Sequence, residues 1–278
     1  MKNRLVKQEN GSVAVYAIAT VLCFVFLLSG MFYSSTAIRK NQLKTVLKLK
    51  EIYAQEIELQ NKDYVKAGLV LQYDGINNTG NGHSNNTTAW KDLSGHGNDG
   101  TLSRPLDATF SWENNNISIA GASSTLGTYV DTPLNLNGKE RTIFYTIDGT
   151  NLTGSIWGDT DNDNTNGLFN YNTFIANRGS STSTQSRYDY TFAKSGKSHY
   201  AVTLSATQLK FYVNGVLTNT TNNTVGLTTS NNLRVLAAYF PTQNATNLKM
   251  YDFMVYNRVL NDQEILQNYE VDKLKYGL

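Results

Sequence analysis

The segment from Asn10 to Ile38 contains no charged residue, and within it Val13–Phe32 is an almost unbroken apolar run of 20 residues. A helix of that length covers roughly 30 Å, which is the thickness of the hydrocarbon core of a bilayer. Helices of soluble proteins are seldom apolar on every face for so long. We therefore expect a membrane-spanning helix. A cleaved secretory signal is the main alternative, because Ser35 and Ala37 are small residues near the end of the run.

The next segment, residues 36–66, contains neither Gly nor Pro and is rich in Lys, Glu, Gln and Leu, which favour helix. Apolar residues recur at near-helical spacing: Ile38, Leu43, Val46, Leu47, Ile52, Tyr53 and Ile57. We expect one helix of about 50 residues, running from the flank and span (residues 1–35) into a stalk (36–66). The apolar stripe could support self-association, but Lys50 interrupts it and the repeat is too short to establish a coiled coil.

The charge differs between the two parts of the chain. Residues 1–66 carry ten basic and five acidic residues, whereas residues 67–278 carry fourteen basic and seventeen acidic ones. Since the second part has no basic cluster, we expect no nucleic-acid partner. Basic residues flank both sides of the apolar run, and their count slightly favours a cytoplasmic body. Long domains that follow a short flank are translocated largely regardless of that count, so we expect a single-pass membrane protein with an extracellular body.

The leader, from about Lys7 to Glu58, has Gly11 after a basic segment, then Ser12, the apolar run and the amphipathic extension. It resembles type IV pilin-like subunits and the short membrane leaders of tight-adherence pilus proteins. In pilins a prepilin peptidase cuts after such a glycine, and the fifth mature residue is normally Glu. Here that residue is Tyr16, a departure that weakens the expectation of processing and filament assembly. A pilin-like structural subunit is therefore an alternative function.

Residues 67–278 have a different composition, dominated by Asn, Thr, Ser and Gly. Paired Asn and Gly mark turns because both tolerate positive φ. Short runs of strand composition lie between the turns: Leu69–Tyr73, Ile117–Ile119, Thr142–Ile147, Thr173–Ile175, Arg187–Phe192, His199–Leu204, Gln208–Val213, Leu233–Ala238 and Lys249–Tyr256. This spacing predicts an all-β fold, a sandwich of two antiparallel sheets. The single cysteine, Cys23, lies in the apolar run, so no intramolecular disulfide supports the fold.

Two of these runs are predicted to form a hairpin. Apolar and polar residues alternate in His199–Leu204 and in Gln208–Val213, and only residues 205–207 connect them. Asn214–Gly215 follows at once and predicts a tight turn into a third strand.

One helix is predicted in this part, at its C-terminal end. Asn261 and Glu264 have the spacing of a capping box, and Leu260 and Ile265 that of a hydrophobic staple. We expect the helix to run from about Asp262 to Lys273.

Four segments occur in an order that is known from one family. They are Leu69–Gly75, then Trp90–Leu102 with the pattern W-x-D-x-S-G-x-G-N-x-G-x-L, then Phe211–Gly215, and last Tyr256–Leu260 with Glu264–Ile265 and Asn268–Tyr269. Together they cover about residues 67–278, which resemble bacterial laminin-G-like domains of the concanavalin A-like lectin/glucanase superfamily. The resemblance implies a jelly-roll of two antiparallel sheets, often extracellular, used for carbohydrate or protein adhesion and sometimes with calcium. It implies no particular activity.

Most of the motif residues also have a structural interpretation, which we favour. Trp90 is expected to anchor the core, and the glycines of the motif permit tight turns. Asp92 and Asn98 are expected to bond backbone amides within the loop.

We expect no enzymatic activity. The E-x-D-x-x-E pattern of the glucanases is absent, and retaining hydrolysis needs two carboxylates about 5 Å apart. The body has four glutamates, Glu113, Glu140, Glu264 and Glu270. Its histidines lie in unrelated contexts, His83, His96 and His199. A glycoside hydrolase or accessory domain is the least favoured alternative.

The segment Asp159–Asn164 is the candidate metal site. Asp159, Asp161 and Asp163 alternate there and supply the carboxylate oxygens that calcium prefers. The EF-hand template fails, since Asn164 stands at its sixth position instead of Gly and Asn170 at its twelfth instead of Glu. A solvated acidic turn is the alternative, so calcium is a candidate cofactor.

Carbohydrate binding needs an aromatic platform beside polar groups. The candidate ligand-binding residues are Tyr171, Tyr188, Tyr190 and Tyr239. Strand alternation places half of such a set in the core, and the sequence does not reveal which half. The function we expect is a membrane-anchored cell-surface binding or adhesion module that recognises carbohydrate or a protein partner.

Overall fold

The computed structural model describes residues 18–23, 25, 36–60, 62–120, 127–159, 165–181, 183–190, 196–228, 231–238 and 245–278. The chain divides into two compact units, Met1–Glu58 and Leu59–Leu278, and each is described by itself. The boundary between the two units lies within residues 36–66, the segment expected as the stalk. The folded body begins upstream of Ala67, for reasons given below.

The first unit is helical where it is described. Residues 18–23 and 25 are helical, and α2 spans Thr36–Gln60, as the stalk sequence predicts. Its apolar residues Leu43, Leu47 and Ile52 are exposed. Most of the apolar run lies outside the described residues, and within the described ranges no helix is both long and apolar enough to cross a membrane.

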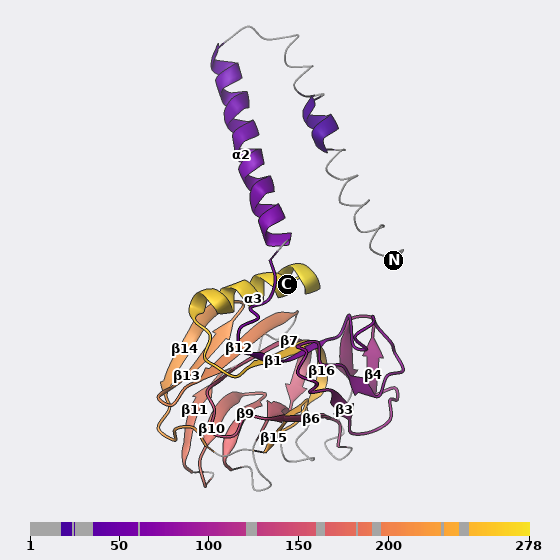
Figure 1. Cartoon of the computed structure of the whole chain (residues 1–278), viewed down its shortest axis with the longest axis vertical. Coiled ribbons are helices and arrows are strands. Elements are labelled where there is room, and N and C mark those ends of the chain that lie inside the picture. The colour runs from indigo at the N-terminus through magenta and orange to yellow at the C-terminus, as the bar shows by residue number, and fades with distance from the viewer. Residues whose placement is uncertain are drawn as a thin grey trace. The chain divides into compact units, whose positions relative to one another are not determined.

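The second unit contains two eight-stranded antiparallel sheets, which we name sheet A and sheet B (Figure 1). Sheet A has the order β14-β13-β12-β7-β16-β5-β4, and β1 also pairs with β16. Its strands are β1 Leu69–Asp74, β4 Phe110–Glu113, β5 Asn116–Ile119, β7 Arg141–Thr153, β12 Ser198–Leu204, β13 Gln208–Val213, β14 Val216–Asn222 and β16 Thr246–Tyr256.

Sheet B has the order β11-β10-β9-β8-β15-β6-β3-β2. Its strands are β2 Ala89–Trp90, β3 Gly100–Leu102, β6 Val130–Asn135, β8 Ser155–Gly158, β9 Gly167–Tyr171, β10 Phe174–Arg178, β11 Gln185–Asp189 and β15 Asn232–Val235. Two antiparallel sheets with one C-terminal helix agree with the predicted jelly-roll sandwich.

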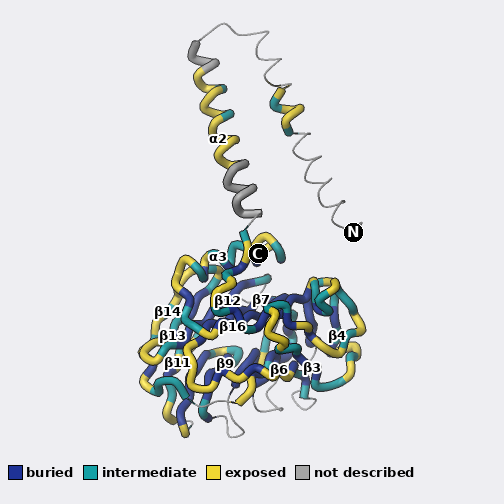
Figure 2. Tube along the Cα trace, viewed as in Figure 1, coloured by how far each residue is buried: buried dark blue, intermediate teal, exposed yellow. Residues whose placement is uncertain are grey.

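A hydrophobic core fills the space between the sheets, and the dark blue trace in Figure 2 follows it through the strands. Trp90 is fully buried, stacks on Tyr73 at 5.1 Å between ring centroids and meets Trp112 edge-on at 5.2 Å. Trp157 and Tyr145 fill another part of the same core. The predicted role of Trp90 as a core anchor is confirmed.

The helix α3, Asp262–Tyr276, packs on the outer face of sheet A. Its capping box is present, since the Asn261 side chain accepts from the Glu264 N–H and the Glu264 carboxylate accepts from the Asn261 N–H. Leu260 and Ile265 share a buried cluster with Phe144 of β7, which confirms the staple. Local sequence therefore fixes where this helix starts.

The segment just before β1 belongs to this packing as well. Tyr64 is buried in the same cluster, and its hydroxyl donates to Asp272 of α3 at 2.5 Å. The Val65 N–H donates to the Asn268 side chain at 2.9 Å, and the Val65 carbonyl accepts from the Tyr256 hydroxyl at 2.8 Å. Residues 62–66, expected as the end of the stalk, thus contribute to the sandwich.

Several strands were not predicted, chiefly β4, β6, β8 and β9. These are short or contain Gly, Asn or Pro, which lower strand propensity. In β6, for example, Pro133 occupies an exposed position between buried Thr132 and Leu134. The predicted run through Ala238 is also too long, because Leu236 has φ of 69° and ends β15 early. The predicted hairpin β12–β13 and the Asn214–Gly215 turn into β14 are confirmed.

Candidate functional site

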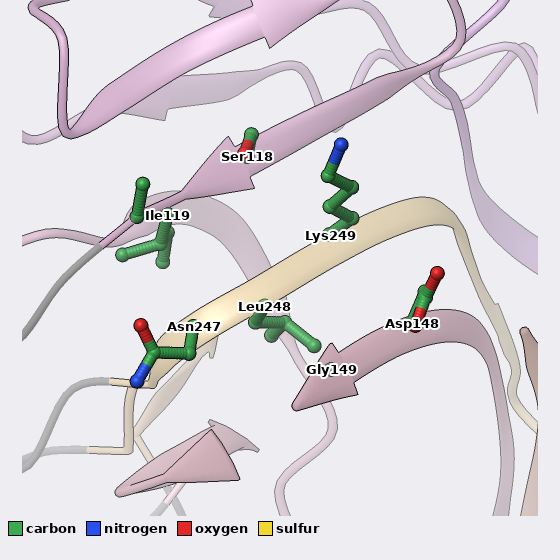
Figure 3. A pocket seen from close by; sticks show the side chains of 8 residues that line it. Ser118, Ile119, Asp148, Gly149, Asn247, Leu248 and Lys249 are labelled. Atoms are coloured by element: carbon green, nitrogen blue, oxygen red, sulfur yellow. The ribbon is translucent and has the colours of Figure 1, made fainter. Parts of the chain in front are cut away.

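A groove of about 420 Å³ lies on the outer face of sheet A, across β5, β16 and β7 (Figure 3). It is lined by Ser118, Ile119, Ala120, Asp148, Gly149, Asn247, Leu248 and Lys249. Volumes of this size accommodate small ligands. The groove is therefore the candidate binding site of the sandwich.

The register of three strands creates this groove. Lys249 of β16 is the cross-strand partner of Ser118 on β5 and of Asp148 on β7, so the three side chains form one lateral row. Beside the row, Ala120 and Gly149 are too small to cover the backbone. A Cβ on Gly149 would lie 3.0 Å from the Asn247 carbonyl oxygen and 3.7 Å from the Leu248 side chain, so a larger residue would crowd the start of β16.

The start of β16 is irregular at the same place. Asn247 has φ of 54°, in the left-handed region, and the register with β7 shifts between Thr246 and Leu248. Bulges of this kind redirect side chains and often lie beside binding sites. Here the irregularity places Asn247 on the wall of the groove.

The charges in the groove are unequally paired. The Lys249 ammonium binds the Glu113 carboxylate at 2.7 Å. Burial raises the pKa of Glu113, but hydrogen bonds from Lys249 and Asn116 outweigh it and hold that pKa below its usual value. No residue in the described ranges forms an ion pair with Asp148, which is half-buried. Burial, followed by Asp148 and Glu113, raises the pKa of nearby Tyr251 to about 12.

A second surface, the outer face of sheet B, carries aromatic rings and arginines. Tyr171 and Phe174 stack at 5.5 Å, and Phe169 meets Phe174 edge-on at 5.4 Å. The Arg187 guanidinium lies 3.6 Å from the centre of the Phe174 ring, and that of Arg178 lies 4.6 Å from Phe169. We name these five residues the aromatic–arginine face.

Three of the four predicted tyrosines are described, and they divide between this face and the core. Tyr171 lies on the aromatic–arginine face and is half-buried. Tyr188 and Tyr190 pack against the inter-sheet core, where Tyr190 stacks on Phe211 at 4.5 Å. Tyr239 lies outside the described residues. Strand register separates Tyr171 from Tyr188, because Tyr171 lies opposite Phe174 of the aromatic–arginine face and Tyr188 lies opposite the core residue Ile175. The sequence alone does not show this register.

Among the predicted calcium ligands, Asp161 and Asp163 lie outside the described residues. Asp159 is 2% exposed and its carboxylate is already engaged: one oxygen pairs with the buried guanidinium of Arg141, and the other accepts from the Leu168 N–H at 2.7 Å. Arg141 begins β7 of sheet A, whereas Asp159 follows β8 of sheet B. Asp159 therefore links the two sheets. No group of three metal-ligating side chains with suitable spacing occurs in the described part of the chain.

The loop after Trp90 has the structural role that its motif suggested. The Asp92 carboxylate accepts four hydrogen bonds of 2.9 to 3.0 Å, from the backbone of Gln72, Ser94 and Asn98 and from the Ser94 hydroxyl. Asn98 differs from expectation, because its side chain donates to the Val70 carbonyl at 2.8 Å instead of bonding an amide.

Two features were missed by sequence reasoning. One is the row of Ser118, Asp148 and Lys249 in the groove, three residues from three distant segments. The other is a buried acidic cluster under α3 that contains Asp252 and Asp272. Both features depend on strand register. The only local signal was Asp252, an acidic residue in the middle of an otherwise apolar strand.

Comparison with known proteins agrees with the fold. The family model Laminin_G_3, described as concanavalin A-like lectin/glucanases superfamily, matches residues 112–266. No curated protein matches significantly. The match does not reach the N-terminal leader, and the pilin-like leader finds no support.

Among solved structures, Trypanosoma rangeli sialidase in complex with sialic acid aligns with a TM-score of 0.53 at 18% identity, covering 74% of this chain and 33% of the sialidase chain. A mutant of that sialidase displaying trans-sialidase activity gives 0.55 at 17% identity, covering 84% and 39%. The binding domain of botulinum neurotoxin DC, in complex with rat synaptotagmin II, gives 0.52 at 15% identity, covering 74% and 52%. This chain thus spans about a third of the sialidase, and such identities show the fold alone.

The expectation of a protein without enzymatic activity is contradicted. Trypanosoma rangeli sialidase and its trans-sialidase mutant are enzymes that contain this fold, so the fold does not argue against catalysis. The absence of the glucanase acids excludes one arrangement of catalytic groups only. The family model matches more than half of the residues, and the chain therefore belongs to the concanavalin A-like lectin/glucanases superfamily.

Proposed function

We propose that the sandwich is a cell-surface binding module that recognises carbohydrate in the groove across β5, β16 and β7. The observation that carries the proposal is the lateral row of Ser118, Lys249 and Asp148 beside an uncovered stretch of sheet. A carboxylate accepts two hydroxyl hydrogen bonds at once, and ammonium and amide groups donate to sugar oxygens. Asp148, without an ion-pair partner in the described ranges, is the acceptor we assign to a sugar diol.

The comparisons support a ligand of this class. Trypanosoma rangeli sialidase, which shares the fold, has been solved with sialic acid bound. That ligand belongs to the sialidase, and we transfer only the general class, a saccharide, to this chain. Ala120 and Gly149, which also line the groove, carry no bulky side chain that would keep the flat face of a sugar ring away from the backbone.

The groove is tested with the full-length chain in detergent on a glycan array. If the proposal holds, Asp148→Asn loses at least tenfold in affinity for any glycan bound, because it removes a charge-assisted acceptor. The matched control is Asp131→Asn, which alters an exposed carboxylate on sheet B that pairs with Arg234. Equal binding by all three proteins would exclude the groove, and the same samples are assayed for cleavage of the bound glycan.

A second candidate function is recognition of a protein at the aromatic–arginine face. Tyr, Phe and Arg together are the residues that protein interfaces favour. Tyr171 and Phe174 are only partly buried there, with the Arg187 guanidinium against Phe174. The botulinum neurotoxin binding domain, which has this fold, was solved with a protein bound. Tyr171→Ala should weaken cell-surface adhesion without changing glycan binding, and the reverse pattern would reject this candidate.

The proposal includes attachment to a membrane with the sandwich outside the cell. Its support is the sequence of residues 13–32, an apolar run long enough to span a bilayer. We expect the native protein to require detergent for extraction, and we expect external protease to digest the sandwich on intact cells. Release by carbonate washing would reject anchoring, and protection from protease would reject the orientation.

Calcium is part of the proposal as a weakly bound ion at the loop of Asp161 and Asp163. Clustered carboxylates repel one another, and a divalent cation relieves that repulsion. Calcium at about 100 times its dissociation constant would stabilise the fold by roughly 2.7 kcal/mol. Thermal melts should therefore rise by several degrees with calcium, and Asp161→Asn should remove most of the rise. A melt unchanged by millimolar calcium would leave the loop as a solvated turn.

A further inference from the structure

A row of polar side chains crosses the outer face of sheet A beneath α3. Asp74 on β1 is the cross-strand partner of Asp252 on β16, which is opposite Thr146 on β7, which is opposite His199 on β12. Asp272 of α3 covers this row. Asp252 is 2% exposed, and Asp272 and His199 are completely buried. An extra residue in β16, between Met250 and Asp252, sets the alternation that places Asp252 under the helix.

The hydrogen bonds of this cluster are incomplete. Asp252 accepts from the Thr146 N–H at 2.7 Å, and Asp272 accepts from the Tyr64 hydroxyl at 2.5 Å. In each carboxylate, the second oxygen receives no hydrogen bond from the described part of the chain. The Thr146 hydroxyl and the two ring nitrogens of His199 also have no hydrogen-bond partner there. His199 Nε2 lies 3.1 Å from Asp272 Oδ2, without the alignment of a hydrogen bond.

The two carboxyl groups lie within hydrogen-bonding reach of each other. Two ionised carboxylates can only accept, so neither satisfies the other. A single proton between them supplies the missing donor and removes one of two buried like charges. The geometry therefore calls for a shared proton.

Neighbouring groups supply too little positive charge to replace that proton, since Lys275 lowers the pKa of both aspartates less than burial raises it. The charged and titratable groups that face the pair are Asp74 from β1, Tyr256 from β16, His199 from β12, Lys275 and Tyr276 from α3, and Tyr64. The Lys275 ammonium is engaged by Asp74 at 2.7 Å, and the Tyr276 hydroxyl also donates to Asp74. No set of three metal ligands with suitable spacing occurs among the described residues, so a proton is the simplest occupant.

The titration of the cluster agrees with this geometry. Burial, followed by Asp272, raises the pKa of Asp252 well above its usual value, and burial raises the pKa of Asp272 to about 6. Burial lowers the pKa of His199 to about 4, so the ring is neutral at pH 7. At neutral pH the cluster thus holds one proton on two carboxyl groups, and no imidazolium.

We propose that Asp252 and Asp272 share one proton and that this proton latches α3, together with the Tyr64 segment, onto sheet A until alkaline conditions release them. Release would uncover the apolar cluster of Phe144, Tyr212 and Met254, which α3 now covers. The latch is independent of the glycan groove, because it involves neither Asp148 nor Lys249.

The direction of the pH effect follows from counting protons. In the released state both aspartates are solvated and ionised at neutral pH, whereas the latched state keeps one proton. Each release therefore gives up one proton, and its equilibrium constant rises tenfold for each pH unit above about 6.5, until the latched pair ionises. His199 opposes this only at lower pH, where it gains a proton on release.

Hydrogen exchange of the full-length chain in detergent tests the latch. Exchange rates are corrected for the intrinsic effect of pH, and the amides of α3 are compared with those of β13 from about pH 6.5 to pH 9. We expect the α3 opening constant to rise tenfold per pH unit in the wild type. Asp252→Asn carries a permanent donor in nearly the same shape, so its α3 should show no such slope.

Asp131→Asn, which alters an exposed carboxylate on sheet B, should keep the wild-type slope. Infrared spectra at pH 7 provide a second readout, since the wild type should show a protonated carboxyl band that Asp252→Asn lacks. The proposal would be overturned by a flat pH profile in the wild type or by a slope that persists in Asp252→Asn. It would also be overturned by a slope that a chelator changes, because a cation would then occupy the site.

Discussion

The outer faces of the two sheets hold their charged residues in opposite ways. On sheet A, α3 seals Asp252, Asp272 and His199 from water, and burial shifts each of their pKa values toward the neutral form. On sheet B, the Arg187 guanidinium lies over Phe174 and pairs with Asp189, whose side chain is 68% exposed. At neutral pH the covered face thus holds a half-protonated pair of acids and a neutral imidazole, whereas the open face holds full charges.

The difference shows what a covering helix does to a sheet face. A charge that stays in contact with water is already solvated, so a weak interaction, such as one with an aromatic ring, is enough to hold it in place. A carboxylate under a helix must either find a cation or take up a proton. Asp159 shows that a buried carboxylate can also stay ionised, because it is paired with the buried guanidinium of Arg141.

The largest effect is expected where a charge is buried and paired. Asp159→Ala leaves the Arg141 guanidinium buried without its partner, and we expect a loss of about 3–5 kcal/mol in the free energy of unfolding. Asp131→Ala, which breaks the exposed pair with Arg234, should cost at most about 1 kcal/mol. Urea unfolding of both variants gives the two values. Similar losses would mean that burial does not separate these pairs.

A large loss is also expected where α3 packs on sheet A. Ile265 is fully buried in the cluster with Phe144 and Met254, so Ile265→Ala should destabilise the fold by about 3 kcal/mol. Leu266, the next residue, is 42% exposed and provides the control, for which we expect less than about 1 kcal/mol. Thermal or urea unfolding tests the pair, and an equal response would show that α3 adds little to stability.

The start of the folded unit can be tested by truncation. A fragment that begins at Leu59 keeps Tyr64, and one that begins at Ala67 lacks it. We expect the longer fragment to be more stable by about 2–3 kcal/mol, the sum of burying one aromatic ring and making its hydrogen bonds. Denaturant midpoints of the two fragments decide this, and coincident curves would return the boundary to Ala67.

His199 should give the sandwich a distinct acid response. Its pKa is lowered to about 4 in the folded state, so below about pH 6.5 the unfolded chain binds a proton that the folded chain does not. The stability contributed by this group is therefore lost as pH falls, by about 2 kcal/mol between pH 6.5 and pH 5. Asp252 and Asp272 act in the opposite direction in the same window.

The comparison of wild type with His199→Gln isolates this effect, because the aspartates are common to both. The difference in their unfolding free energies should shift by that amount in favour of the variant as pH falls. A constant difference from pH 6.5 to pH 5 would contradict a buried, neutral His199.

The smallest effect is expected on sheet B. Arg187→Ala removes the guanidinium from the Phe174 ring, and for a water-exposed contact this should cost about 0.5–1 kcal/mol. Arg187→Lys should recover only part of it, since an ammonium does not stack. Thermal unfolding at low and high salt measures both. A loss as large as that of Ile265→Ala would show that this face is packed as tightly as the one under α3.

Local sequence determined much of this protein. The alternation in β12 and β13, the Asn214–Gly215 turn and the capping box at Asn261 were all predicted, because each signal acts between residues a few positions apart. The motif around Trp90 was also interpreted correctly as core and turn. These features need no knowledge of which strands are neighbours.

Tertiary structure alone decided the sites. Ser118, Asp148 and Lys249 form a row only through the pairing of β5, β16 and β7. Asp252 meets Asp272 only because one extra residue in β16 sets the alternation and α3 docks above it. A strand turns successive side chains to opposite faces, so a shift of one residue in register exchanges core for surface. That shift is set by long-range packing, which no short stretch of sequence contains.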